Sequence, residues 1–177
     1  MRFLARALGV ITAASLVMLA AACGYHVAGT ATRLPPDVKV IAIPTFVNDS
    51  PRFKIEQRIT AAVMREFIQR TDFQVTPNPK GADAEIKGTV ESVRSGVLTF
   101  DPNTGRATTF QIQVNASVQL IDLHTKKVLF ANPNYIFREE YQVSESAPAL
   151  FEEDVPAMNR LSRDFARTLV TDIIENF

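Results

Sequence analysis

The residues that could do chemistry are few, and they are scattered along the sequence. The chain has one cysteine, Cys23, and two histidines, His26 and His124. Paired acids occur at Glu139-Glu140 and at Glu152-Glu153-Asp154. A cysteine thiolate is a nucleophile, whereas imidazole and carboxylate groups move protons or bind metals. These are the chemistries that the sequence has to support or exclude.

None of these residues has the spacing of a catalytic or metal-binding set. The sequence contains no His-x-x-x-His, Cys-x-x-Cys or Asp-x-Asp-x-Asp-Gly pattern, no Gly-x-Ser-x-Gly elbow and no glycine-rich phosphate loop. Adjacent acids on a strand point to opposite faces, and acids at a helix start are stabilised by the helix dipole. We therefore interpret both acidic clusters as structural and expect no enzyme activity, no metal and no cofactor.

Cys23 follows a segment typical of a secretory signal peptide. Arg2 and Arg6 give a positive start, and Ala7 to Leu19 is uncharged and apolar. This segment is shorter than the roughly 20 residues of a membrane-spanning helix. Ala20-Ala21-Ala22 supplies the small residues that a signal peptidase requires. We expect residues 1–22 to be removed.

The thiol of Cys23 is interpreted as a lipidation site. A lone cysteine in an exported chain would otherwise be a reactive thiol. The small-small-Cys sequence resembles a bacterial lipobox, although the usual leucine stands one position early, at Leu19, with Ala20 in its place. This resemblance implies a diacylglyceryl group on the sulfur and a further acyl chain on the amine, which together give stable anchoring. The alternative is a secreted protein with an unpaired N-terminal thiol.

The charge balance bears on possible partners. The chain has 19 Lys and Arg against 19 Asp and Glu, and removal of the leader with Arg2 and Arg6 leaves 17 against 19. Because there is no basic surplus, we expect no nucleic-acid partner. Any anion-binding site has to be local.

The mature chain is predicted to form a tether and one domain. Residues 23–37 are the lipidated N-terminus and tether, and residues 38–177 are a single α/β domain. Helices are expected over about 51–70, with Ser50 as the N-cap, and over about 152–176. Strands are expected over about 38–44, 73–75, 84–100, 110–120 and 128–143. The last is either one strand or a pair of half-strands broken at Pro133. The predicted fold class is α+β, a two-layer sandwich with an about four-stranded sheet packed against two helices.

The strand over 110–120 has the clearest pattern. Its apolar residues alternate with an uncharged polar set, namely Gln111, Gln113, Asn115, Ser117 and Gln119. Such a face can hydrogen-bond another surface without the cost of burying charge, so it favours a partner-facing or interior-facing sheet. A merely polar exposed face remains the alternative.

Several smaller features leave alternatives open or predict local structure. Even spacing places Tyr135, Phe137 and Tyr141 on one face of the predicted strand, and that face suits either an interface or the core. Near Ser92 the apolar residues change from one face of the predicted strand to the other, which predicts a bulge. The residues from Asp101 to Gly105 predict a turn.

The first helix carries cations outside its apolar stripe. They form either a lipid-phosphate surface or a solvated face, and they are Arg52, Lys54, Arg58, Arg65 and Arg70.

The order of these motifs resembles one family. The stretch from Cys23 to Gly29, CGYHVAG, is similar to the C-G-[FY]-H-[LV]-x-G opening of the LPS-assembly lipoproteins of the LptE (RlpB) family. Residues 38–67 are similar to that family's I-x-x-F-x-N-x-S strand, loop and helix, and ADAEIKGTVES at 82–92 resembles its next strand start. The resemblance covers nearly all of the mature chain in order and length.

The resemblance implies a lipoprotein at the periplasmic side of the cell outer membrane. Such a protein partners with and plugs an LptD-like β-barrel, and the pair inserts lipopolysaccharide into the outer leaflet. Lipopolysaccharide phosphates would need basic groups. The family's motifs transfer no positions for these groups, so the candidates are chosen from the turns and hairpin of this sequence: Arg94, Arg106, Lys126 and Lys127.

The alternative function is a lipid-anchored periplasmic regulator of a cell-wall synthase. Such regulators usually have long tethers. Here about 14 residues separate Cys23 from the first predicted strand, and a stretched chain of that length spans under about 50 Å. The domain would therefore stay near its own membrane.

Overall fold

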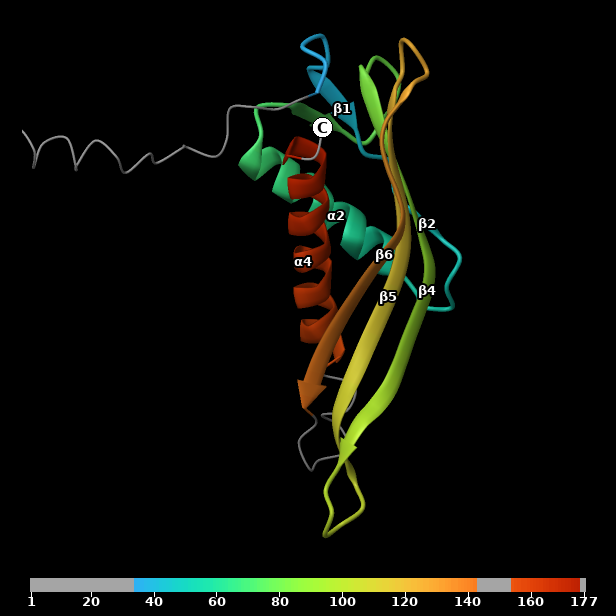
Figure 1. Ribbon diagram of the computed structural model, residues 1–177, viewed down its shortest axis with the longest axis vertical. Helices are drawn as coiled ribbons and strands as arrows, with labels where there is room; N and C mark the ends of the chain where they lie inside the picture. The colour runs from blue at the N-terminus through green and yellow to red at the C-terminus, as the bar shows by residue number, and fades with distance from the viewer. Residues whose placement is uncertain (1–33, 143–153, 176–177) are drawn as a thin grey trace, which may run out of the picture. The chain divides into compact units, whose positions relative to one another are not determined.

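The computed structural model of the chain describes residues 34–142 and 154–175 (Figure 1). The predicted signal peptide, Cys23 and most of the predicted tether lie outside the described residues. In the described body, two helices pack on one side of a six-stranded sheet (Figure 1). The predicted α+β class with two helices is confirmed, but the predicted count of about four strands is wrong.

The sheet combines short parallel strands with long antiparallel ones. The strands are β1 (Val40–Ala42), β2 (Val47–Asn48), β3 (Gln74–Thr76), β4 (Ala84–Phe100), β5 (Ala107–Asp122) and β6 (Val128–Gln142). Their order is β3-β1-β4-β5-β6, and β2 pairs separately with β4. Strands β1 and β3 correspond to the predicted strands at 38–44 and 73–75. The strand that the sequence did not predict is β2, because its two residues are too few to show an alternating pattern.

The long strands follow the sequence pattern closely. On β5, the apolar residues from Ile112 to Leu120 are buried against the helices, with at most 1% exposure. The register between β4 and β5 shifts between Val90 and Ser92, which confirms the bulge predicted near Ser92. The predicted turn is also present, since the Asp101 carboxylate accepts two backbone N–H groups and Gly105 takes a positive φ of 67°.

Strand β6 is continuous across Pro133, so of the two predicted alternatives the single strand is confirmed and the pair of half-strands is wrong. Pro133 and Asn134 together oppose Ser117 of β5, because the register pairs Ala116 with Tyr135 and Val118 with Asn132. This arrangement is a β-bulge, which accommodates a proline without ending the strand. In the described sheet β6 is an edge strand.

Helix α2 (Ile55–Arg70) begins later than predicted. Ser50 is not its N-cap, because the Ser50 hydroxyl contacts Asn48 Oδ1 at 2.7 Å and accepts the Arg52 N–H at 3.3 Å in a preceding turn. Lys54 then adopts a left-handed φ of 61°, which separates that turn from the helix.

Helix α4 (Asp154–Glu175) completes the core. Its predicted stripe is buried and consists of Met158, Leu161, Phe165, Leu169 and Ile173. The Phe165 ring makes edge contacts with Phe46, Tyr135 and Phe137 at centroid distances of 6.2, 5.6 and 5.1 Å. Tyr135 and Phe137 therefore belong to the core rather than to an interface. No helix in the described ranges is long and apolar enough to cross a membrane.

Candidate functional site

The uncharged polar residues of β5 lie on the side of the sheet that carries no helix. Figure 1 shows α2 and α4 on the same side of β4, β5 and β6, so the opposite side is not covered by either helix. We call the β5 residues on that side the amide face: Gln111, Gln113, Asn115, Ser117 and Gln119. Four of them are half-buried and Gln119 is exposed.

The amide face is organised by hydrogen bonds between its side chains. The Gln113 Nε2 group donates to Asn115 Oδ1 at 3.0 Å, and the Arg138 Nε group donates to Gln113 Oε1 at 2.9 Å. Gln111 donates to Glu140 at 3.3 Å. Since most of these amides bond only one or two neighbours, they retain donors and acceptors for a second surface.

Charged residues flank the amide face on the neighbouring strands. Gln113 lies opposite Arg94 of β4 and Arg138 of β6, and Gln119 lies opposite Lys87. The surface is therefore neutral along its centre and charged at its sides. That distribution is typical of an interface with a polar rim.

The four predicted lipopolysaccharide-binding cations do not form one cluster. Arg94 lies within β4 on the side of the amide face, and Arg106 follows the turn at the tip of the β4–β5 hairpin. Lys126 and Lys127 occupy the β5–β6 turn, at the other end of β5. Sixteen residues of strand correspond to about 50 Å, so the two ends cannot contact one small group together.

The hairpin tip has an apolar character that the sequence reasoning missed. Val97, Leu98 and Phe100 are 41%, 48% and 62% exposed, close to Arg106. The run Gly96 to Phe100 beside a strong turn is the sequence signal that could have identified it. Exposed apolar residues next to a cation suit an amphiphilic ligand or a partner surface.

The β5–β6 turn is fixed by an Asp83–His124 pair. His124 Nε2 lies 3.1 Å from Asp83 Oδ1, and the other Asp83 oxygen accepts the N–H groups of Lys39 and Val40, each at 2.8 Å. The hydrogen bond from His124, followed by those from the backbone, lowers the pKa of Asp83 to about 2. The same hydrogen bond raises the pKa of His124. The pair joins the turn to β1, which is a structural role.

The acidic clusters are also engaged in structural contacts where the structure describes them. Glu139 pairs with Arg160 of α4, whereas Glu140 accepts from Gln111 on the opposite side of the sheet. Asp154 begins α4 and pairs with Arg52. Among the described residues, no group of three or more His, Cys, Asp or Glu side chains could hold a metal ion.

Comparison with known proteins assigns a family to this arrangement. The family model described as LptE, lipopolysaccharide-assembly, matches residues 38–175. The chain belongs to the LptE family. It is thereby a member of a non-enzymatic family of membrane-associated lipoproteins that act in lipopolysaccharide assembly.

Solved structures share the fold of this LptE-family chain at low identity. The solution structure of an uncharacterized lipoprotein B from Nitrosomonas europaea is 14% identical, with a TM-score of 0.53 over 80% of this chain and 88% of that one. The hypothetical protein CT253 from Chlamydia trachomatis is 11% identical, with a TM-score of 0.50 over 79% and 99%. These likenesses show the fold alone. No curated protein matches the chain.

Proposed function

We propose that this protein is a lipid-anchored outer-membrane lipoprotein on the periplasmic side that partners with an LptD-like β-barrel and plugs its lumen. In that position it would take part in the insertion of lipopolysaccharide into the outer membrane. Membership of the LptE family supports the process. The helix-free amide face of β5 is the observation that supports docking against a partner.

The chemistry of the amide face suits the inside of a large barrel. Barrel lumens are polar, so a plug gains from hydrogen bonds more than from apolar contact. Neutral amides can be buried at such a contact without the desolvation penalty of charges. The half-buried Gln113 and Asn115 at the centre of β5 provide both donors and acceptors.

Site-specific crosslinking tests the docking surface. A photoreactive amino acid at Gln113 should crosslink to a large, heat-modifiable β-barrel protein in intact cells. The control position is Arg167, which is exposed on α4, on the other side of the body. Equal crosslinking from both positions would contradict docking through the amide face, and capture of a cell-wall synthase would favour the regulator alternative.

The anchor is proposed to be the acylated Cys23 at the start of the mature chain, after removal of residues 1–22. The segment up to residue 37 then tethers the domain of residues 38–177. A Cys23→Ala variant should fold normally but leave the membrane fraction, because the body of the protein does not contain the anchor. Mass spectrometry of the mature N-terminus checks the modification directly. A free thiol there would refute it.

Lipopolysaccharide contacts are proposed at the cations identified from the sequence. The hairpin pair Arg94 and Arg106 lies on the same hairpin as the exposed Leu98 and Phe100, so that part of the surface could meet both phosphates and acyl chains. Lys126 and Lys127 form a separate candidate site. Substitution of Arg94 and Arg106 by Gln should reduce the lipopolysaccharide that reaches the cell surface. The comparison is a double variant with Lys126 and Lys127 replaced by Gln. If surface lipopolysaccharide is unchanged in the Arg94/Arg106 variant, the hairpin is excluded as a lipopolysaccharide-binding site.

A further inference from the structure

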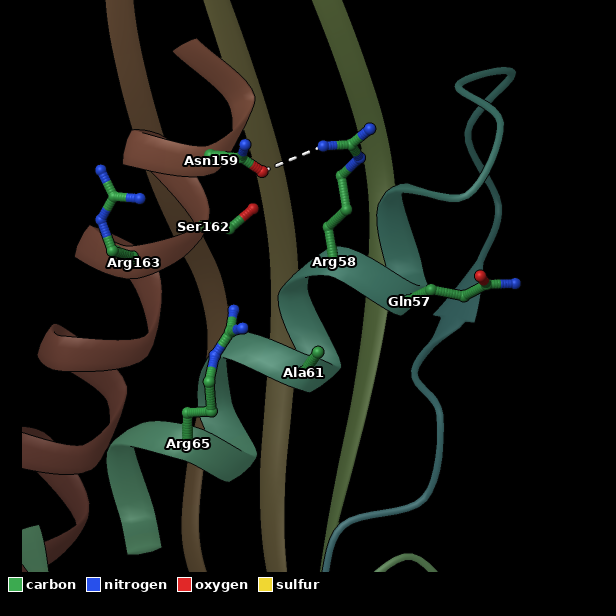
Figure 2. Close-up of a pocket in the computed structure, with 7 residues that line it drawn as sticks. All are labelled: Gln57, Arg58, Ala61, Arg65, Asn159, Ser162 and Arg163. Carbon is green, nitrogen blue, oxygen red and sulfur yellow. Dashed lines mark hydrogen bonds between the residues drawn. The ribbon is translucent and has the colours of Figure 1, made fainter. Parts of the chain in front are cut away.

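A hollow lies between α2 and α4 on the side of the helices that faces away from the sheet. Its volume is about 410 Å³, within the range of small-ligand pockets. Figure 2 shows the two helices in front of the strands, with the lining side chains projecting from both helices. The lining residues are Gln57, Arg58, Ala61, Arg65, Asn159, Ser162 and Arg163.

Small residues and a bridging hydrogen bond shape this hollow. Ala61 of α2 and Ser162 of α4 have short side chains, which leave space where the helices face each other. The Arg58 Nη1 group donates to Asn159 Oδ1 at 2.9 Å, across the space between the helices (Figure 2). The Arg58 guanidinium is therefore held at the hollow by a contact within the fold.

Three arginines line the hollow, and no carboxylate does. Arg65 and Arg163 make no ion pair or hydrogen bond with any other described side chain. Figure 2 shows the Arg65 side chain rising into the space between the helices. Like charges at one site raise each other's electrostatic energy, which a bound anion would lower.

Four carboxylates of the two helices contact other groups rather than Arg65 or Arg163. Glu66 pairs with Arg70 at 3.5 Å, and Asp164 lies 4.0 Å from Arg167. Asp154 pairs with Arg52. Glu56 accepts a hydrogen bond from Asn48 at 2.9 Å.

We propose that the groove lined by Arg58, Arg65 and Arg163 binds a phosphate ester, the group carried by phospholipid headgroups and by phosphorylated glycolipids. Guanidinium groups present paired N–H donors that match phosphate oxygens, and they bind phosphate in a bidentate manner. The lining is polar and compact, so it suits a small anion better than a long acidic peptide. Since the amide face lies on the opposite side of the sheet, this site does not depend on the proposed barrel docking.

The test compares two variants of equal charge. The full chain in nonionic detergent is titrated with inorganic phosphate and pyrophosphate by calorimetry. It is then sedimented with vesicles of phosphatidylcholine that contain either phosphatidylglycerol or lipid A. The groove variant is Arg65→Gln with Arg163→Gln. The matched control is Lys39→Gln with Lys80→Gln, two exposed lysines that lie outside the hollow and whose loss frees no carboxylate of the helices. Circular dichroism and thermal melting verify that both variants are folded.

We expect saturable binding of pyrophosphate, weakened at least about tenfold in the groove variant and less than about twofold in the control. Vesicle binding that the groove variant loses supports the site, and the vesicle type that retains the protein identifies the source of the phosphate. Absence of saturable binding would overturn the proposal. So would an equal loss in the control variant, or tighter binding of a polyglutamate peptide than of pyrophosphate.

Discussion

Gly88 should be the position on β4 where an added methyl group costs most. A Cβ built at Gly88 would lie 2.2, 2.3 and 2.5 Å from three ring carbons of Phe46. Ordinary contacts between such carbons are at about 3.5–4.0 Å, so in Gly88→Ala the ring or the strand has to move by more than about 1 Å. The ring has little room to move, because Phe46 is 3% exposed and contacts Phe165 edge-on.

The backbone of Phe46 is also held in place. Its N–H donates to Thr60 Oγ1 of α2 at 3.0 Å, so a shift of the ring disturbs the loop before α2 as well. Overpacking of this kind costs about 1–3 kcal/mol. We expect a loss near the upper end, about 2–3 kcal/mol, or a fall of about 5–10 °C in Tm for a body of this size.

Thermal and urea unfolding followed by circular dichroism measure this loss. The control is Gly96→Ala on the same strand, where a Cβ meets nothing within 4 Å and the free energy of unfolding should change by less than about 0.5 kcal/mol. Phe46→Leu combined with Gly88→Ala should be more stable than the sum of the single changes predicts, because the clash is relieved. If the Gly88→Ala variant has the same melting temperature as the wild-type protein, the close packing of Phe46 on β4 is refuted.

Three further substitutions test the core, an ion pair and a part-buried hydrogen bond. Val114→Asp places an unpaired charge at a fully buried position on β5 and should cost more than about 4 kcal/mol; a native-like circular dichroism melt would mean that the orientation of the strand is inverted. The pKa of Asp83 is lowered from 3.8 to about 2, so this carboxylate stabilises the fold above about pH 4 and loses that effect as the pH falls toward 2. In the Asp83→Asn variant, the free energy of unfolding, measured in urea, should therefore fall less steeply as the pH is lowered below about 4. An unchanged dependence on pH would contradict the assignment. Tyr135→Phe removes the 2.7 Å hydrogen bond to Asp172 and should lower the free energy of unfolding by about 1 kcal/mol, measured in urea, whereas a stability gain would show that this hydroxyl is unfavourably buried.

The elements with a long, regular pattern could be predicted from the sequence. The alternation along residues 110–120 gave the orientation of β5, because a period of two leaves only one way to bury the apolar residues. The bulge near Ser92 and the turn at Asp101 follow from local rules and are confirmed. The apolar stripe of α4 is another pattern of this kind.

The two-residue strand β2, the turn before α2 and the tertiary groupings could not be predicted in this way. Ser50 has the sequence signature of an N-cap, but its hydroxyl is used in the turn with Asn48, a competition that the sequence does not reveal. Arg65 and Arg163 are far apart in the chain, and only the packing of α2 against α4 places both at one hollow. The sequence alone leaves Arg65 on either a lipid-phosphate surface or a solvated helix face, and it gives no reason to place Arg163 beside it.

The bulge at Pro133 has a consequence for how copies of this protein behave beside one another. An edge strand as long as β6, 15 residues, would offer its unpaired backbone groups to an incoming strand from another copy. Pro133 has no N–H to donate, and the charged Arg138 and Glu140 oppose a close neighbour. At the other edge, β3 is only three residues long. Beyond its pairing with β2, β4 has a further open edge from Glu91 to Phe100. Joining of copies through β6 or β3 is thus disfavoured, so any strand exchange between concentrated copies should use that edge of β4.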